Sequence, residues 1–507
     1  MLLLLLIIST PLFIGAHALS LQEYSYYPAL QEHSAPVPLL DPLEQDIPTR
    51  QTSLYSNIGS PSIITRASLP YTISSPGRYI LVEAGSYSPA ASGTAITINA
   101  SDVNLDLLSF NLVQANGVAS VNGVVVASGL SNVTIQNGVV RDFSGVGISV
   151  GSGCSRVFVN NVTFYDCGNR GLELVGTANS PIQVGALTNC NFVSSSTLST
   201  ADNVLTISNC SDFEVAHCNL HNNGSTGASG ALAMVNMTNN LRCKFTDLEV
   251  HNNIGNTDLR CYDLKQSSYC KFIRCHGNTN LAWGASSAMY GVLLEGSSTS
   301  TANLFCECVM ANLTGTIVDG FLSSTNCDDN AFMLCKSLNN QANSTTGVVH
   351  GFRCITNNRN IYVECLAAHN TAPSSTVASP LYGAYGFKLD TTTGTYLRKC
   401  VANDQTAASR AVGYFFISDN QITIEENAAS RNTTFGFDAA NVTFNNQAFI
   451  KNFALKNNTA GGSGSDQYNG FGANAANDGF TASNFGTNTG GITGQPGPIS
   501  WVNLGIG

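Results

Sequence analysis

Charge is scarce in this sequence of 507 residues. Only 11% of the residues are Asp, Glu, Lys or Arg, the net charge is −10, and Lys and Arg form no runs. Binding to nucleic acid needs clustered cations that neutralise phosphates, so we expect no nucleic-acid partner. Disorder is not expected either. Disordered chains combine high charge with few apolar residues, whereas 43% of this chain is hydrophobic.

Helical periodicity and long apolar runs are also missing. Gly and Asn interrupt the chain too often for long helices. Beyond the N-terminus no segment is long and apolar enough to cross a bilayer, so we expect no transmembrane segment. The 16 cysteines lack the CxxC-type spacing, with partner ligands, that zinc sites require. We therefore assign them no metal.

The N-terminus contains one short apolar run. Residues 1–18, MLLLLLIISTPLFIGAHA, are typical of a secretory signal peptide that ends in a small-residue cleavage pattern. A buried N-terminal strand is the alternative, because no Lys or Arg precedes the run. The signal peptide predicts a protein that is secreted or held at the cell surface.

Repetition organises the rest of the chain. Residues 351–370 read GFRCITNNRNIYVECLAAHN, and they align with GFKLDTTTGTYLRKCVAND at 386–404 and with GYFFISDNQITIEENAASRN at 413–432. Each copy has a Gly followed by an aromatic residue, a polar turn, a second apolar run and a small-residue stretch ending near Asn. The copies recur roughly every 23 to 35 residues, a period that is typical of solenoids and other repeat arrays.

Within each copy apolar and polar residues alternate, which indicates strands with one buried face. Strands that recur with no helix between them stack in parallel when the chain coils. We therefore predict an all-β parallel β-helix of roughly a dozen coils, with two or three short strands in each coil. A β-sandwich is the alternative, but the hairpin dipeptides that it requires are scarce.

Stacked coils place equivalent residues in columns. The Gly before each aromatic residue is expected at a bend that needs an unusual backbone angle. The aromatic residues are expected to form an interior stack that contains Phe321, Phe352, Phe387, Tyr414 and Phe437. Asn residues near the bends are expected to hydrogen-bond along the axis, and the candidates are Asn278, Asn312, Asn339, Asn370 and Asn403.

Cysteine recurs once per copy. Cys308, Cys335, Cys365 and Cys400 stand at the same place in successive copies, and Glu426 takes that place in the next one. Such residues lie one strand spacing apart, about 4.8 Å. Free Cys packs like a small apolar residue, so we favour a buried column of thiols over the disulfide framework that an exported protein allows.

Three segments carry a family resemblance. GRYILVEAG at 77–85, ASDVNLDLLSFNL at 100–112 and SNVTIQNGVVRDFSGVGISV at 131–150 resemble the opening coils of right-handed parallel β-helix proteins of the pectin lyase-like superfamily, above all its large exported bacterial members. The likeness covers most of residues 71–450 and implies a right-handed β-helix. It specifies no activity, because this coil serves lyases, hydrolases, epimerases, tailspikes and adhesins.

The chain is divided accordingly. After the signal peptide, residues 19–70 are rich in Pro and polar residues and are interpreted as a linker and N-terminal cap. Residues 71–452 are assigned to the β-helix. Residues 453–507 are dominated by Gly, Asn, Ser and Thr and are interpreted as a loose C-terminal tail.

The resemblance suggests two kinds of catalytic site. Polygalacturonase-like members hydrolyse with clustered aspartates, which residues 256–258 (NTD) and the pair Asp328-Asp329 match only superficially. Those groups are some seventy residues apart, whereas paired catalytic carboxylates lie roughly 5 to 10 Å apart. The Gly-His and Arg-Ile-Lys motifs of that family are absent. We therefore treat this match as accidental.

Pectate lyase-like members use Arg or Lys as the base, with carboxylates that hold calcium. If Phe352 and Phe387 point inward, Arg353 and Lys388 point outward on adjacent coils. Asp390 is then on the same face, with Asp328 and Asp329 about a coil away. Cations beside carboxylates bind uronates directly or through calcium, which takes oxygen ligands. The alternative is a solvated strand face with no binding role.

The leading hypothesis is an exported, non-catalytic β-helix protein that presents a long face to glycans or to a surface protein. It rests on the missing catalytic motifs. The competing hypothesis is a polysaccharide lyase or glycoside hydrolase for acidic glycans, and calcium is expected as a cofactor only in that case. His276, His350 and His369 fall in or near the expected turns and receive no role. The oligomeric state is left open.

Overall fold

The computed structural model describes the β-helix and little of either end. The described residues are 60–195, 203–225, 230–295, 299–373, 383–408, 410–417, 421–439, 448–455, 457, 468–469 and 503–506. The predicted signal peptide, most of the predicted linker and most of the predicted tail lie outside them. No helix within these ranges is long and apolar enough to span a membrane.

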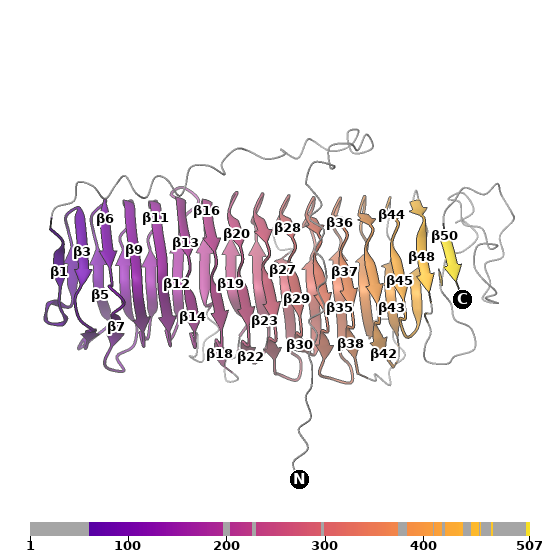
Figure 1. The fold of residues 1–507 in the computed structure, drawn as a ribbon, viewed down its shortest axis with the longest axis horizontal. Coiled ribbons are helices and arrows are strands. Elements are labelled where there is room, and N and C mark those ends of the chain that lie inside the picture. The colour runs from indigo at the N-terminus through magenta and orange to yellow at the C-terminus, as the bar shows by residue number, and fades with distance from the viewer. Residues whose placement is uncertain are drawn as a thin grey trace, which may run out of the picture. The chain divides into compact units, whose positions relative to one another are not determined.

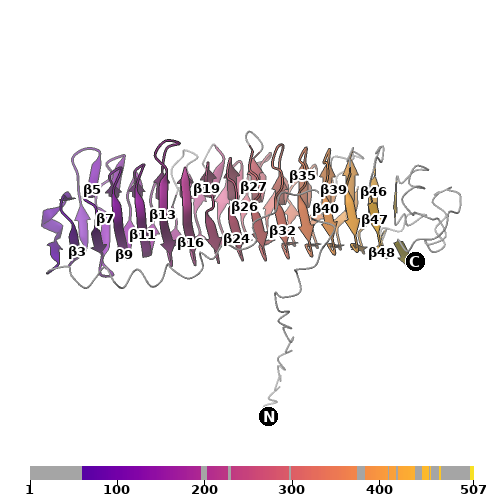
Figure 2. The same cartoon turned by 90° about the horizontal axis from the view of Figure 1, so that it is seen from above.

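The described residues form a parallel β-helix, as predicted (Figures 1 and 2). One coil begins with β31 (Ile317–Ser323), continues through β32 (Ala331–Met333) and β33 (Lys336–Leu338), and closes with β34 (Gln341–Ala342). The next coil starts at β35 (Val348–Ile355). The coil thus has four short strands where two or three were expected, because a bend separates β32 from β33 and another separates β33 from β34.

Three sheets run along the solenoid. Sheet A has 28 strands and includes β32 and β33, sheet B has 15 strands and includes β31 and β35, and sheet C has seven two-residue strands and includes β34. The strands of sheet B that matter below are β27 (Ala288–Glu295), β31, β35, β39 (Gly383–Asp390), β43 (Ala411–Ile417) and β46 (Phe435–Ala439). Each is hydrogen-bonded in parallel to the next.

The predicted aromatic stack is confirmed. Phe352 lies 4.7 Å from Phe321 and 4.8 Å from Phe387, measured between ring centroids, and the rings are within 4° of parallel. Tyr414 and Phe437 extend the stack with separations of 5.0 and 4.7 Å. The sequence prediction missed a second stack on sheet A, formed by Phe245, Phe272, Phe305, Phe332 and Tyr362 at 4.6 to 4.9 Å. The two stacks meet edge to face inside the solenoid.

The glycines before these aromatic residues serve a different purpose from the one expected. Gly351 and its equivalents do not adopt positive φ, so that prediction was wrong. A Cβ at Gly351 would lie 2.6 Å from the carbonyl oxygen of Gly386 and 2.7 Å from the Cβ of Ala367. Glycine is therefore required here because backbone and opposite wall approach closely.

The unusual backbone angles occur at polar and apolar residues instead. Asp329, Leu334 and Asn339 have φ of 58°, 55° and 53°, and equivalent residues of the neighbouring coils behave alike. Non-glycine residues rarely adopt this left-handed conformation. Their five-residue spacing marks the corners of the coil, between which the strands are only two or three residues long.

An asparagine ladder runs inside these corners, but mostly through residues other than those predicted. Asn278, Asn312 and Asn339 are exposed and Asn403 is half-buried, so these four lie outside the buried ladder. The predicted bonding along the axis is nevertheless seen between Asn312 and Asn278 at 2.8 Å, and Asn403 accepts a hydrogen bond from Ser430 of the next coil at 2.7 Å. Asn370 is buried and accepts a hydrogen bond from the backbone N–H of Asn340. The main ladders join the buried sets Asn223–Asn253–Asn280, Asn303–Asn330–Asn360, Asn427–Asn452 and Asn432–Asn457.

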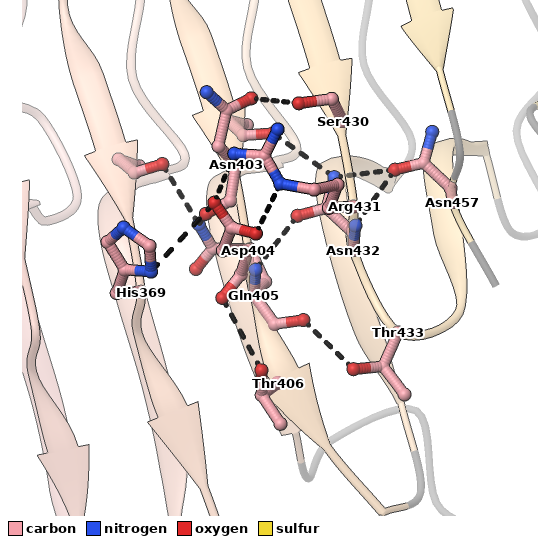
Figure 3. A network of polar contacts seen from close by, with 12 residues as sticks. His369, Asn403, Asp404, Gln405, Thr406, Ser430, Arg431, Asn432, Thr433 and Asn457 are labelled. Atoms are coloured by element: carbon pink, nitrogen blue, oxygen red, sulfur yellow. Dashed lines mark hydrogen bonds and ion pairs between the residues drawn. The ribbon is translucent and has the colours of Figure 1, made fainter. Parts of the chain in front are cut away.

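Gln405 interrupts one ladder (Figure 3). It takes the place of an asparagine between Asn370 and Asn432, and its longer side chain donates to the carbonyl oxygens of Ala367 and Asn403 at 2.9 and 2.8 Å. The amide nitrogen of Asn370 and the amide oxygen of Gln405 are consequently buried without a partner in the described part of the solenoid. Buried polar groups left unpaired cost about 1–3 kcal/mol each.

Replacement of Gln405 with Asn is therefore expected to raise the free energy of unfolding by about 1 kcal/mol, because the shorter amide restores the ladder. Denaturant titration measures the change. Asn432→Gln is the matched control, since it introduces the same fault one coil later and is expected to lower the free energy of unfolding by a similar amount. Destabilisation by Gln405→Asn would contradict this account of the ladder.

The thiol column is confirmed. Cys308, Cys335, Cys365 and Cys400 are buried and free, and the Sγ of each contacts a backbone carbonyl of the preceding coil at 3.3 to 3.5 Å. The expected place of Glu426 was wrong by one residue. Asn427 follows Cys400 in the column, and its side chain accepts a hydrogen bond from the Cys400 N–H at 2.7 Å.

Candidate functional site

Polar and aromatic side chains gather on the outer face of sheet B. One outward column holds Tyr290, Asp319, His350 and Tyr385. The next outward column holds Leu322, Arg353, Lys388 and Phe415. Arg353 and Lys388 point outward because they directly follow the inward Phe352 and Phe387, and successive strand residues point to opposite faces. His350 likewise follows the inward Val349 and contacts Asp319 and Tyr385 on the outer side. We call Asp319, His350, Arg353, Tyr385, Lys388 and Phe415 the sheet-B cluster.

Asp319 and His350 form a buried dyad in this cluster. His350 Nδ1 lies 2.5 Å from Asp319 Oδ1, and both side chains are at most 1% exposed. Arg353 Nη1 lies 3.6 Å from Asp319 Oδ2. Burial alone would raise the pKa of Asp319, but its contacts with His350 and Arg353 outweigh burial and lower the pKa. Asp319 is therefore ionised and holds the proton of His350 on Nδ1.

The second ring nitrogen of His350 is left with a free lone pair. Burial lowers the pKa of His350 to about 3, against the opposing effect of Asp319, and the positive charges of Arg353 and Lys388 lower it further. The imidazole is thus neutral near pH 7. Its Nε2 is buried and has no hydrogen-bond partner among the residues that the structure describes. The ring stacks on Tyr385 with centroids 5.4 Å apart, which fixes its orientation.

Lys388 is a buried cation without a carboxylate partner in the described part of the chain. Its Nζ lies 5.4 Å from the ring centroid of Tyr385 and 6.0 Å from that of Phe415, and the residue is 3% exposed. Burial and the nearby Arg353 lower its pKa to about 8, although Asp390 and Asp319 oppose the shift. A lysine in this state binds an anion or donates a proton readily.

Charged pairs flank the cluster on both sides. Arg410 packs over the Phe415 ring at 4.5 Å and is paired with the buried Asp438. On the other side, Arg260 contacts Asp263 at 2.8 Å. Burial raises the pKa of Tyr290, which lies between this pair and Asp319, to about 12, so its phenol stays protonated. These pairs neutralise each other, whereas Lys388 is not neutralised in this way.

The structure brings some of the candidate residues predicted from the sequence together and places others elsewhere. Arg353 and Lys388 are directly paired in register on adjacent coils, and Asp390 is two residues beyond Lys388 on the same face. Asp328 and Asp329 lie at a corner and are held by the next coil. Asp328 accepts a hydrogen bond from the Asn358 N–H at 2.7 Å, and Asp329 is held by both Nε and Nη2 of Arg359 at 2.7 Å. They are not part of the sheet-B cluster.

His350 contradicts its predicted position. It lies within strand β35 and not in a turn, whereas His369 is exposed at a corner with φ of 55°. His276 begins a short strand and contacts Glu249 at 2.8 Å. The repeat contained a signal for His350, because Asp319, His350 and Tyr385 each stand immediately before the repeated Gly. In the described residues, no group of three or more His, Cys, Asp and Glu side chains is arranged to hold a metal.

The comparisons with known proteins concern the fold. No family model matches the sequence, and neither does any curated protein. Among solved structures, the chain is similar to the periplasmic alginate epimerase AlgG, with 12% identity, 78% of this chain and 82% of that chain covered, and a TM-score of 0.31. It is also similar to the A-module of the Azotobacter vinelandii mannuronan C-5 epimerase AlgE6, with 12% identity, 89% and 91% covered, and a TM-score of 0.35.

A mannuronic acid-specific polysaccharide family 6 lyase from human gut microbiota is a third similar structure, with 9% identity, 78% and 86% covered, and a TM-score of 0.36. With such low scores, the activities of these proteins are not transferred to this chain.

Proposed function

We propose that the sheet-B cluster binds an acidic polysaccharide and that the protein is exported to do so. The observation that carries the proposal is Lys388, a buried ammonium that lies near two aromatic rings and has no carboxylate partner within the described ranges. A carboxylate of a uronate would neutralise it and offset the cost of its burial. Arg353, directly adjacent in register and partly exposed, offers a planar guanidinium to the same or the next carboxylate.

Export is supported by the predicted signal peptide and by the long solenoid, which suits a polymeric ligand. A polymer lying along the solenoid axis meets the same kind of position in each coil, with coils about 4.8 Å apart. The aromatic rings of Tyr385 and Phe415 supply an apolar surface beside the cations. Pockets for carbohydrate and other ligands combine such surfaces with a few placed polar groups.

Binding to a panel of acidic and neutral polysaccharides, with and without calcium, tests this proposal. We expect acidic polysaccharides to bind and neutral ones to bind at least about tenfold more weakly, because a hydrogen bond to a charged group contributes about 1.5–3 kcal/mol. Arg353→Ala and Lys388→Met are each expected to weaken binding by about tenfold or more. Arg359→Ala, an exposed arginine at a corner, is the control and is expected to leave affinity unchanged.

Lys388→Met has a second expected effect that separates a functional residue from a structural one. A pKa lowered from 10.5 to about 8 means that folding disfavours the protonated amine at pH 7, so the Met variant is expected to be more stable by about 1–3 kcal/mol. Between pH 8 and 10.5 the unfolded wild type binds more protons at this position than the folded protein. Its stability should rise with pH in that window, and the variant should lose this rise.

A lyase is the second candidate function, and the Asp319–His350 dyad favours it. An oriented, neutral imidazole with a free Nε2 is suited to remove the proton beside a carboxylate that Arg353 and Lys388 neutralise. The electron pair then forms a carbon–carbon double bond as the glycosidic C–O bond breaks, and the ammonium of Lys388 protonates the leaving oxygen. Hydrolysis by two carboxylates is less favoured, because Asp319 is already held by His350 and Arg353.

A further inference from the structure

Sheet A has an apolar outer face that is independent of the sheet-B cluster. It is formed by four successive three-residue strands, β28 (Leu304–Cys306), β32, β36 (Ile361–Val363) and β40 (Tyr396–Arg398). The middle residue of each points into the core. The outward residues are mostly apolar and half-buried, and include Leu304, Ala331, Met333, Ile361, Val363 and Tyr396.

The same two outward columns are more polar in several other coils. In the same two outward columns, the earlier strands β16 (Cys210–Ala216) and β20 (Lys244–Thr246) carry Glu214, Lys244 and Thr246. A strand face exposed to water normally carries polar residues of that kind. A contiguous apolar patch on the surface of a soluble protein marks an interaction site. We name the outward residues of β28, β32, β36 and β40 the sheet-A face.

A column of charged corner residues borders the sheet-A face, and its order is informative. Measured from the midpoint between β32 and β36, Glu307 and Lys399 are equally far away on opposite sides, one and a half coils distant. Arg274 and Glu426 form the next equidistant pair, and Asp247 and Lys451 the one after. Each pair combines opposite charges. The innermost pair, Leu334 and Glu364, has a single charge.

We propose that the sheet-A face binds the same face of a second copy of this chain. The two-fold axis runs along the strand direction and passes between β32 and β36, so that the two solenoids are antiparallel. Met333 then faces the partner's Val363, Ala331 faces the partner's Ile361, and Leu304 faces the partner's Tyr396. Glu307 faces the partner's Lys399, and Arg274 faces the partner's Glu426.

The charges select this axis over its neighbour. An axis through β32 would place Glu307 against the partner's Glu364 and Arg274 against the partner's Lys399, and like charges in contact are unfavourable. The midpoint axis converts these contacts into opposite-charge pairs, and two-fold symmetry makes each pair occur twice. This axis also places the apolar residues at the centre of the interface, because β28 and β40 are then equally far from it.

The area is sufficient for a dimer of modest affinity. The proposed interface extends beyond the sheet-A face to the strands that carry the outer charge pairs. From β20 to β47 (Ala448–Ile450) it spans seven strand spacings, or about 34 Å, and a width of five residues adds about 16 Å. Two copies therefore bury about 1,100 Å² in total, just above the roughly 1,000 Å² expected of a specific interface. We expect a dimer that dissociates in the micromolar range.

Sedimentation of the full chain between about 1 and 100 μM tests the inference. A reversible monomer–dimer equilibrium is expected. Met333→Glu places a charge at the centre of the interface twice, and is expected to weaken association at least about thirtyfold. Thr134→Glu, in the same kind of outward position on the distant strand β9 (Ser131–Arg141), is the control and should associate like the wild type. Unchanged far-ultraviolet circular dichroism confirms folding of both.

A charge exchange gives a second test that a damaged fold cannot imitate. Glu307→Lys and Lys399→Glu should each weaken association several-fold, and the double variant should restore it to within about twofold of the wild type. Alkylation of Cys306, the one thiol of 16 that is not fully buried, should slow as the dimer forms. A wild type that stays monomeric, or a dimer that survives Met333→Glu, overturns the inference. Additive losses in the charge double variant overturn the proposed axis.

Discussion

Replacement of Phe352 with alanine is expected to lower the free energy of unfolding by about 3–5 kcal/mol. Phe352 is 1% exposed and stacks between Phe321 and Phe387 at 4.7 and 4.8 Å, with its edge toward Tyr362 at 6.0 Å. Truncation removes all three ring contacts at once. The cavity cannot close easily, because the hydrogen-bonded strands above and below hold the coils at a fixed spacing.

The loss of stability should extend along the solenoid. In a stacked repeat each coil is stabilised by its neighbours, so a weakened contact between two coils weakens the whole column. Chemical denaturation followed by circular dichroism measures the effect. Phe110→Ala is a matched control, because Phe110 is 37% exposed and its truncation should cost about 1 kcal/mol or less. Equal losses in the two variants would show that the interior aromatic stack does not dominate stability.

The aromatic and thiol columns could be predicted from the sequence because one rule governs them. A residue type that recurs once per copy, at an inward position, must stack on its equivalent in the next coil. Phe352 on Phe387 and Cys335 on Cys365 follow directly. The adjacency of Arg353 and Lys388 follows in the same way, one residue beyond the inward aromatic. The register between successive coils thus predicts which residues are neighbours, both in the core and on the surface.

The corners could not be predicted so well, because sequence alone does not say which polar residue turns the chain. Asn and Asp favour the left-handed conformation, yet Leu334, Glu307 and Lys399 adopt it as well. Two or three strands per coil were therefore expected where the coil from β31 to β34 has four. The same error placed the asparagine ladder on the exposed corner residue Asn339 and missed its buried neighbour Asn340.

The Asp319–His350 dyad was missed for a related reason. The inward–outward alternation breaks at Gly351 within β35, so that both Val349 and Phe352 lie in the core while His350 and Arg353 both face outward. Strict alternation from Phe352 would point His350 into the interior. Only the observed backbone shows that Asp319, His350 and Arg353 share a face on adjacent strands.

Replacement of His350 with Gln is expected to abolish most of any lyase activity. A general base contributes about 10²- to 10⁴-fold to a rate, and we expect a loss of that size in the formation of unsaturated uronate from the acidic polysaccharide that binds best. Affinity for the same polysaccharide should change less than about threefold, because Arg353 and Lys388 make the charged contacts. Asp319→Asn should lower the rate as well, since it removes the carboxylate that holds the proton on Nδ1.

The pH dependence follows from the two perturbed groups. With a pKa of about 3, His350 is neutral throughout the range above pH 5, whereas Lys388, with a pKa of about 8, loses the proton that it must donate above that pH. The rate of the wild type should therefore be level from about pH 5 to 7 and fall above pH 8. Lys388→Met should remove the alkaline fall together with most of the activity.

Without a ligand the pKa of His350 is about 3, and a bound uronate changes the neighbouring charges that lower this pKa. Arg353 and Lys388 both lower the pKa of His350, so a carboxylate that neutralises them raises it and makes Nε2 a stronger base where a substrate is present. Transfer of solvent deuterium to a carbon-bound position of the polysaccharide would reveal proton removal even if no bond breaks. Absence of both unsaturated product and deuterium incorporation, with or without calcium, would refute the lyase and leave binding as the function of this face.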